Sequence, residues 1–175
     1  MTPKKIINKT AKKKMIRWAK ESLKLILIIT FFSIAIDAWR SRAMPSENLP
    51  SLSINTLEGD WIDIKKISHE KPVLLYFWAT WCSVCKIVSP SVNWLSDAHQ
   101  VISVAIRSGD DQRLRQFMTY KEYDFPVIND ATGRISQDWG VTATPTIVIV
   151  KNGLISSITT GATTPMGLWL RLYLA

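Results

Sequence analysis

Two cysteines, the only ones in the 175-residue chain, are separated by Ser83-Val84 as Cys82-x-x-Cys85. An apolar, strand-forming run beginning at Val73 precedes them, and the following residues predict a helix from about Cys82 to Ala98. At a helix N-terminus, unpaired N–H groups and the helix dipole stabilise a thiolate. Cys85 lies one turn further on, within disulfide reach of Cys82. The spacing predicts a redox dithiol with Cys82 as nucleophile and Cys85 as resolving thiol.

The two alternative uses of a Cys-x-x-Cys pair are a structural disulfide and half of a zinc site. Structural zinc needs about four ligands, and the only histidines are His69 and His99. A peroxiredoxin site also fits poorly, because it needs Thr-x-x-Cys and Thr80 is only two residues before Cys82. Sulfur redox chemistry with neither metal nor cofactor is the favoured interpretation.

Two segments resemble the active-site regions of the thioredoxin superfamily. The first is Phe77-Trp-Ala-Thr-Trp-Cys-x-x-Cys-Lys86. Its Trp-Ala-Thr-Trp-Cys sequence is most similar to that of the membrane-anchored TlpA-like branch. The second is Gly140-Val-x-x-x-Pro-Thr146, which resembles the loop whose cis-proline faces the cysteines in that family. The resemblance implies an α/β, thioredoxin-like fold with an added N-terminal β-hairpin. It also implies that Trp81, Thr144 and Pro145 position a substrate peptide, with the Thr144 backbone free to pair with it.

Terminal motifs extend this resemblance. Asp37-Ala-Trp-Arg40, Thr163-Thr-Pro165 and Gly167-Leu with Arg171-Leu resemble the suppressor-of-copper-sensitivity protein D group, anchored periplasmic proteins of Gram-negative bacteria. The resemblance implies a thiol:disulfide oxidoreductase whose substrates are protein disulfides or dithiols. Reductase or isomerase activity is favoured, but no residue fixes the direction of exchange, so an oxidase stays open. An electron-transfer partner in the inner membrane is expected with it, and the group's name suggests a link to copper tolerance.

Three positions depart from the family pattern. Tyr76 stands where many thioredoxins have a buried Asp, Val88 stands where TlpA-like reductases often have a Glu, and Ser83-Val84 lacks the common proline. The first two changes remove the carboxylates that usually move a proton at the second cysteine. Two other functions remain open: Cu(I) binding by the same two thiolates, and thiol reduction in cytochrome maturation.

Charge is concentrated at the N-terminus. Residues 1–42 hold 11 Lys/Arg against Glu21 and Asp37, a charge of +9, whereas residues 43–175 hold 11 against 12, a charge of −1. The globular part therefore lacks the basic excess that nucleic-acid binding requires.

The N-terminal region predicts a membrane anchor. The uncharged run Leu25–Ile36 has 12 residues, and Trp18 to Trp39 covers 22, which is enough to cross a bilayer if Lys24 snorkels. We expect a cytoplasmic arm (1–22), a single transmembrane segment (23–39), a linker (40–50) and a periplasmic thioredoxin-like domain (51–175). A cleavable signal peptide and a soluble basic tail are the alternatives.

Periodicity and turn residues predict the elements of the domain. In order, they are a hairpin (51–57 and 61–64), a strand (101–106), a helix capped at Asp110-Asp111, a strand (125–128), a helical turn (134–139), a hairpin (146–150 and 154–159), and a last helix with Thr164 as N-cap and Pro165 at its first position.

Overall fold

The computed structural model describes residues 14–18, 20–25, 27–28, 49–50 and 53–175. The chain divides into two units, Met1–Ala38 and Trp39–Ala175. The described residues of the first unit are helical and exposed. No helix within the described ranges is both long and apolar enough to cross a bilayer. Most of the predicted arm, membrane segment and linker falls outside these ranges and stays a prediction.

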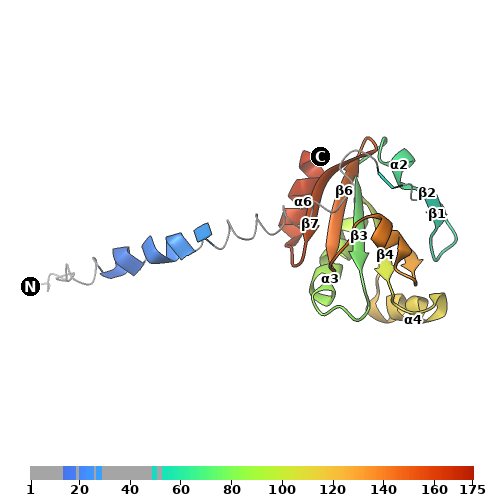
Figure 1. Ribbon diagram of the computed structural model, residues 1–175, viewed down its shortest axis with the longest axis horizontal. Helices are drawn as coiled ribbons and strands as arrows, with labels where there is room; N and C mark the ends of the chain where they lie inside the picture. The colour runs from blue at the N-terminus through green and yellow to red at the C-terminus, as the bar shows by residue number, and fades with distance from the viewer. Residues whose placement is uncertain (1–13, 19, 26, 29–48, 51–52) are drawn as a thin grey trace, which may run out of the picture. The chain divides into compact units, whose positions relative to one another are not determined.

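A five-stranded sheet forms the centre of the second unit, in the order β5-β4-β3-β6-β7 (Figure 1). β3 pairs in parallel with β4, which pairs in parallel with β5, while β6 and β7 join antiparallel on the other side. Every residue of β3 is buried, as its continuous apolar run predicts. The strands are β3 (Val73–Trp78), β4 (Gln100–Ile106), β5 (Val127–Asp130), β6 (Thr146–Lys151) and β7 (Leu154–Thr160). The predicted α/β class is confirmed.

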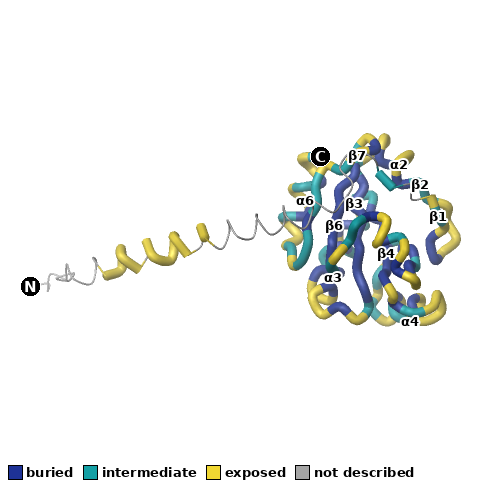
Figure 2. Tube along the Cα trace, in the orientation of Figure 1, coloured by how far each residue is buried: buried dark blue, intermediate teal, exposed yellow. Residues whose placement is uncertain are grey.

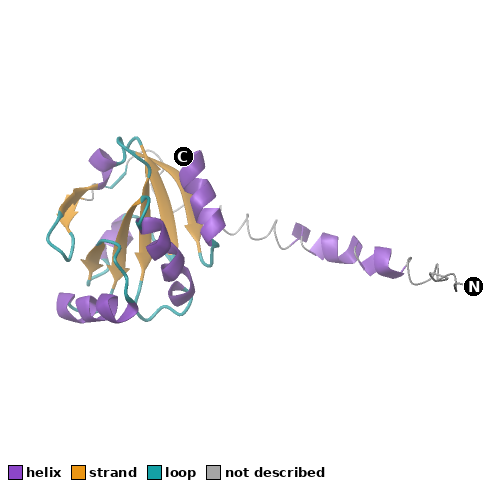
Figure 3. Ribbon diagram, turned by 180° about the vertical axis from the view of Figure 1, so that it is seen from behind, coloured by secondary structure: helices purple, strands orange, loops and turns teal. Residues whose placement is uncertain are grey.

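The side chains of β3 alternate between two hydrophobic cores, one on each face of the sheet. Leu74, Tyr76 and Trp78 join the core covered by α3 (Cys85–Ser96), α4 (Asp111–Lys121) and α6 (Pro165–Leu174). Val73, Leu75 and Phe77 join the core that includes residues of α2 (Ile64–Ile67) and packs against α5 (Arg134–Asp138). The central strands of the sheet are thus buried on both faces (Figures 2 and 3).

Outside this sheet, β1 (Ser53–Asn55) pairs antiparallel with β2 (Trp61–Asp63). The predicted second strand ends one residue early, because the Asp63 side chain accepts a hydrogen bond from Lys66 N–H and caps α2. The Leu57 N–H donates to the carbonyl of Val127 in β5, 2.8 Å away. This hydrogen bond connects the turn between β1 and β2 to the edge strand β5.

Two predicted helix caps are confirmed. Asp110 accepts a hydrogen bond from Arg113 N–H at 2.8 Å, and Thr164 accepts one from Gly167 N–H at 3.1 Å, with Pro165 at the first helical position. The strand predicted at 125–128 begins at Val127 instead, directly after Pro126, which has no N–H to donate to a neighbouring strand. These elements carry the loops that surround the cysteines.

Candidate active site

The cysteines follow β3 at the edge where β4 also ends, since the two strands are parallel. Cys82 and Cys85 form a disulfide with their Cα atoms 5.2 Å apart, so the predicted pairing is present. The turn holding Cys82 is fixed by two hydrogen bonds. Cys82 N–H donates to the Ala79 carbonyl, and Thr80 N–H donates to Ser108 Oγ just beyond β4. The parallel pairing therefore places both loops at the disulfide.

The predicted start of the active-site helix is wrong by three residues. α3 begins at Cys85 with Val84 as N-cap, because residues 79–82 form a separate turn. The helix N-terminus nevertheless reaches Cys82, because the Cys85 N–H donates to Cys82 Sγ at 3.1 Å. An N–H donor in this position stabilises a thiolate on Cys82 when the bond is reduced. The expected electrostatic effect thus comes from one directed hydrogen bond.

Cys82 is the sulfur nearer to solvent. Its residue is 6% exposed against 1% for Cys85. Cys82 Sγ lies 3.6 Å from the carbonyl oxygen of Thr144, and the Thr144–Pro145 peptide is cis, as the resemblance implies. Trp81 is 61% exposed beside it. The structure therefore brings together all five predicted site residues, while the individual roles of Trp81, Thr144 and Pro145 stay predictions.

Cys85 faces a closed aromatic core. Tyr76 OH and Ser89 Oγ form a buried hydrogen bond of 2.9 Å, and Ser89 is one helical turn after Cys85. The Tyr76 ring stacks with Trp78 and meets Phe125 edge-on. Burial raises the pKa of Tyr76 far above the usual value for a phenol, which the Ser89 hydrogen bond only partly offsets. Tyr76 is therefore neutral at physiological pH, and no carboxylate occupies its place.

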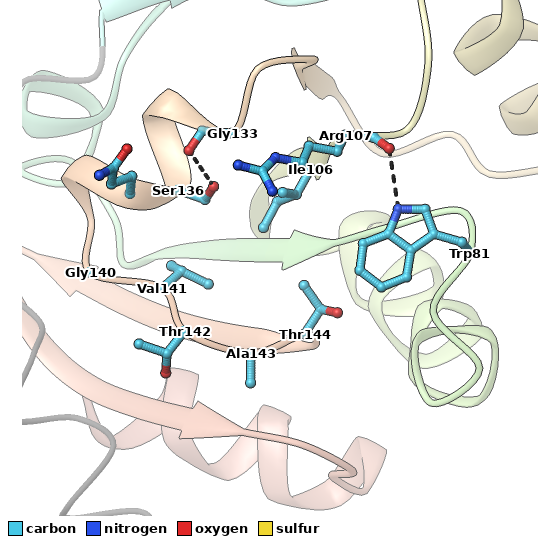
Figure 4. A pocket seen from close by; sticks show the side chains of 11 residues that line it. Trp81, Ile106, Arg107, Gly133, Ser136, Gly140, Val141, Thr142, Ala143 and Thr144 are labelled. Carbon is cyan, nitrogen blue, oxygen red and sulfur yellow. Dashed lines mark hydrogen bonds between the residues drawn. The ribbon is translucent and has the colours of Figure 1, made fainter.

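A pocket of about 460 Å³ opens beside the disulfide (Figure 4). Thr144, which contacts Cys82, also lines this pocket. Trp81 forms one wall, and its indole N–H donates to the Arg107 carbonyl at 3.2 Å. The complete lining is Trp81, Ile106, Arg107, Gly133, Ser136, Gln137, Gly140, Val141, Thr142, Ala143 and Thr144. A peptide bound along the Thr144 loop would meet this pocket.

Sequence reasoning missed three polar residues around the site. Arg107 and Ser108 follow β4 directly, and Ser89 follows Cys85 at helical spacing. The signal for the first two was available, because β3 and β4 were both predicted and the ends of neighbouring parallel strands meet at one edge. Nothing in the sequence indicated that Ser89 would be buried beside the site, because serine is also common on exposed helix surfaces.

Among the described residues, no group of three or more His, Cys, Asp or Glu side chains is placed to hold a metal ion. The two cysteine sulfurs are bonded to each other. The chemistry that this geometry supports directly is therefore breaking and forming a disulfide.

Comparisons with known proteins agree with this geometry. Residues 45–158 match the AhpC/TSA family. A thioredoxin-like protein of Haemophilus influenzae is 34% identical over 89% of this chain and 93% of its own length. The thiol:disulfide interchange protein DsbE homolog of Paracoccus denitrificans is 30% identical over 65% of this chain and 64% of its own. The crystal structure of StoA from Bacillus subtilis superposes with a TM-score of 0.63 at 22% identity, covering 75% of this chain and all of that one, which confirms the thioredoxin-like fold.

Proposed function

The chain belongs to the AhpC/TSA family and is a thiol:disulfide oxidoreductase with a Cys-x-x-Cys pair, and we propose that it is a membrane-anchored, periplasm-facing reductase or isomerase of protein disulfides. The observation that carries the chemistry is the Cys82–Cys85 disulfide seated against the Thr144–Pro145 loop. This arrangement combines two cysteines that can form a disulfide with a backbone segment beside the more exposed cysteine, Cys82. Both parts are needed to exchange disulfides with a polypeptide.

In the reducing direction, the Cys82 thiolate attacks one sulfur of a substrate disulfide. The Cys82–substrate bond forms, and the other substrate sulfur leaves as a thiolate and takes up a proton. Cys85 then loses its proton and attacks Cys82 Sγ, which forms the Cys82–Cys85 disulfide and releases the second substrate thiol. Two electrons have passed to the substrate, and a dithiol donor must reduce the pair before the next cycle.

The unequal burial of the two cysteines supports this order of attack. A polypeptide disulfide can approach Cys82 through the surface formed by Trp81 and Thr144, whereas Cys85, the first residue of α3, is buried in the hydrophobic core. Once Cys82 is joined to the substrate, Cys85 is already within disulfide distance of it. Resolution then needs no large movement of the backbone.

The N-terminal sequence supports membrane anchoring. Residues 1–42 carry +9, and the uncharged segment 25–36 follows most of this charge. A positive segment before an apolar one keeps the N-terminus in the cytoplasm and sends the rest of the chain across the membrane.

Insulin reduction by the membrane-extracted full chain with a dithiol donor tests the chemistry. We expect turnover by the wild type and none by Cys82→Ser. A Cu(I) titration of the reduced protein on the same sample tests the metal-binding alternative. Tight copper binding without any disulfide exchange would replace the proposed activity with metal binding. Reporter fusions after residue 60 test the topology, and activity of a cytoplasm-only reporter would exclude a periplasmic domain.

A further inference from the structure

The pocket beside the disulfide has one charged side chain among its lining residues, Arg107. The other polar side chains in the lining belong to residues such as Ser136, Gln137 and Thr142, which are uncharged. Figure 4 shows the guanidinium of Arg107 on the pocket side, between Ile106 and the start of α5, where Gly133 and Ser136 lie. A cation is thus placed on the route that a substrate peptide would follow.

The backbone of Arg107 is held firmly. Its φ is +45°, an uncommon conformation for a residue other than glycine, and its N–H donates to the Asp130 carbonyl at 2.9 Å. Its own carbonyl accepts the Trp81 indole N–H. The side chain therefore extends from a fixed point that is connected to the residue next to Cys82.

Among the described residues, the guanidinium of Arg107 has one hydrogen-bond partner. Nε donates to the Thr132 carbonyl at 3.3 Å, and within the described part of the chain no carboxylate lies within 4.0 Å of it. Gly133 gives it room, since a Cβ at that position would come within 2.8 Å of Nε. The terminal N–H groups of the guanidinium are thus available for a ligand, and this planar fork matches a carboxylate.

The neighbouring acid does not neutralise Arg107 directly. Asp130 is buried, and its two carboxylate oxygens accept hydrogen bonds from the N–H groups of Ile135 and Ser136 at 3.1 and 2.9 Å. The Ser136 hydroxyl donates to the Gly133 carbonyl. The Asp130 carboxylate and the Ser136 hydroxyl therefore form hydrogen bonds at the start of α5. Arg107 is the charged pocket residue that can contact a substrate.

We propose that this pocket binds the carboxylate of an Asp or Glu side chain close to the reacting cysteine of the substrate polypeptide, with Arg107 as the specificity-determining residue. The proposal rests on the proposed oxidoreductase function. Because an extended chain advances about 3.3 Å per residue, a peptide aligned on Thr144 would place a side chain within a few residues of its cysteine over the pocket. The preferred substrates are then disulfides flanked by acidic residues.

Three disulfide-bridged peptides that differ only in one flanking residue, Glu, Gln or Lys, test the proposal with the full-length protein. We expect kcat/KM for the Glu peptide to exceed that for the Gln peptide by about fivefold at low salt, with the Lys peptide slowest, since one partly exposed ion pair contributes about 1 kcal/mol. The preference should shrink in high salt.

Arg107→Gln and Arg107→Lys are matched variants, because both leave an unbranched side chain on the same backbone. Arg107→Gln should lower the ratio of the Glu-peptide to the Gln-peptide kcat/KM to about one, whereas Arg107→Lys should retain most of the preference. Gln137→Glu gives an independent check at a different position, because an acid in the pocket should repel the Glu peptide. Equal wild-type rates for the three peptides, or an unchanged preference in Arg107→Gln, would overturn the proposal. Failure of the wild type on every peptide would instead overturn the oxidoreductase function.

Discussion

The two sulfurs of one disulfide lie in opposite environments. On the Cys82 side are the exposed indole of Trp81, the Thr144 carbonyl and the pocket that Arg107 lines. On the Cys85 side are buried aromatic rings and the Tyr76–Ser89 hydrogen bond. Two intervening residues, Ser83 and Val84, therefore separate the cysteine that receives a substrate from the buried cysteine that completes the reaction.

Removing each sulfur in turn should have the largest effect on activity. Cys82→Ser should lower the rate of insulin reduction by more than about 1,000-fold, because the nucleophile is lost. Cys85→Ser should also stop turnover but leave Cys82 able to attack, so substrates accumulate as mixed disulfides. Non-reducing gels and mass spectrometry detect these complexes. Equal trapping by the two variants would show that the sulfurs are interchangeable.

Trp78, the last residue of β3, and Trp81, within the turn that follows, should differ in their effects on stability and activity. Trp78 is 1% exposed, so Trp78→Ala should lower the free energy of unfolding by about 3–5 kcal/mol through the cavity it leaves. Trp81→Ala removes an exposed ring and should change stability by less than about 1 kcal/mol, while it slows insulin reduction. Denaturant titration and activity assays separate these effects. A Trp81→Ala protein destabilised as much as Trp78→Ala would contradict the division.

The buried Tyr76 hydroxyl should also affect how the free energy of unfolding depends on pH. The folded-state pKa of Tyr76 is raised by burial, so the neutral phenol is stabilised below pH of about 10 and this stability is lost as the pH rises beyond it. The slope for one such group is at most about 1.4 kcal/mol per pH unit. Tyr76→Phe should therefore show a shallower loss of stability above pH of about 10 than the wild type in thermal unfolding. Identical slopes would mean that the Tyr76 hydroxyl is solvated in the folded protein.

Much of the fold could be predicted because its elements carry local signals. The buried strand at 73–78, the hairpin of β6 and β7, and the caps at Asp110 and Thr164 each follow from apolar runs or turn residues. Helix α2 was not predicted, because its four residues, Ile64–Ile67, are too few to show a period. Its start depends on one side-chain hydrogen bond from Lys66 N–H to Asp63.

Only the site residues that belong to sequence motifs were predicted. Cys82, Cys85 and the Thr144–Pro145 loop belong to recognisable segments, but contacts between distant parts of the chain belong to none. Arg107 holds Trp81 across 26 residues of sequence, and a single basic residue after a strand is typical of an exposed loop. The start of α3 was misplaced for the same reason, since the turn that delays it is fixed by Ser108 from another loop.

Alkylation of the reduced protein at a series of pH values tests the inequality of the two sulfurs most directly. The Cys85 N–H that points at Cys82 Sγ should give Cys82 a thiol pKa well below the ordinary value of about 8.5. Peptide mass spectrometry should therefore find Cys82 modified rapidly at neutral pH and Cys85 modified slowly. Equal rates for both cysteines at every pH would contradict the claim that Cys82 is the more acidic and more accessible thiol.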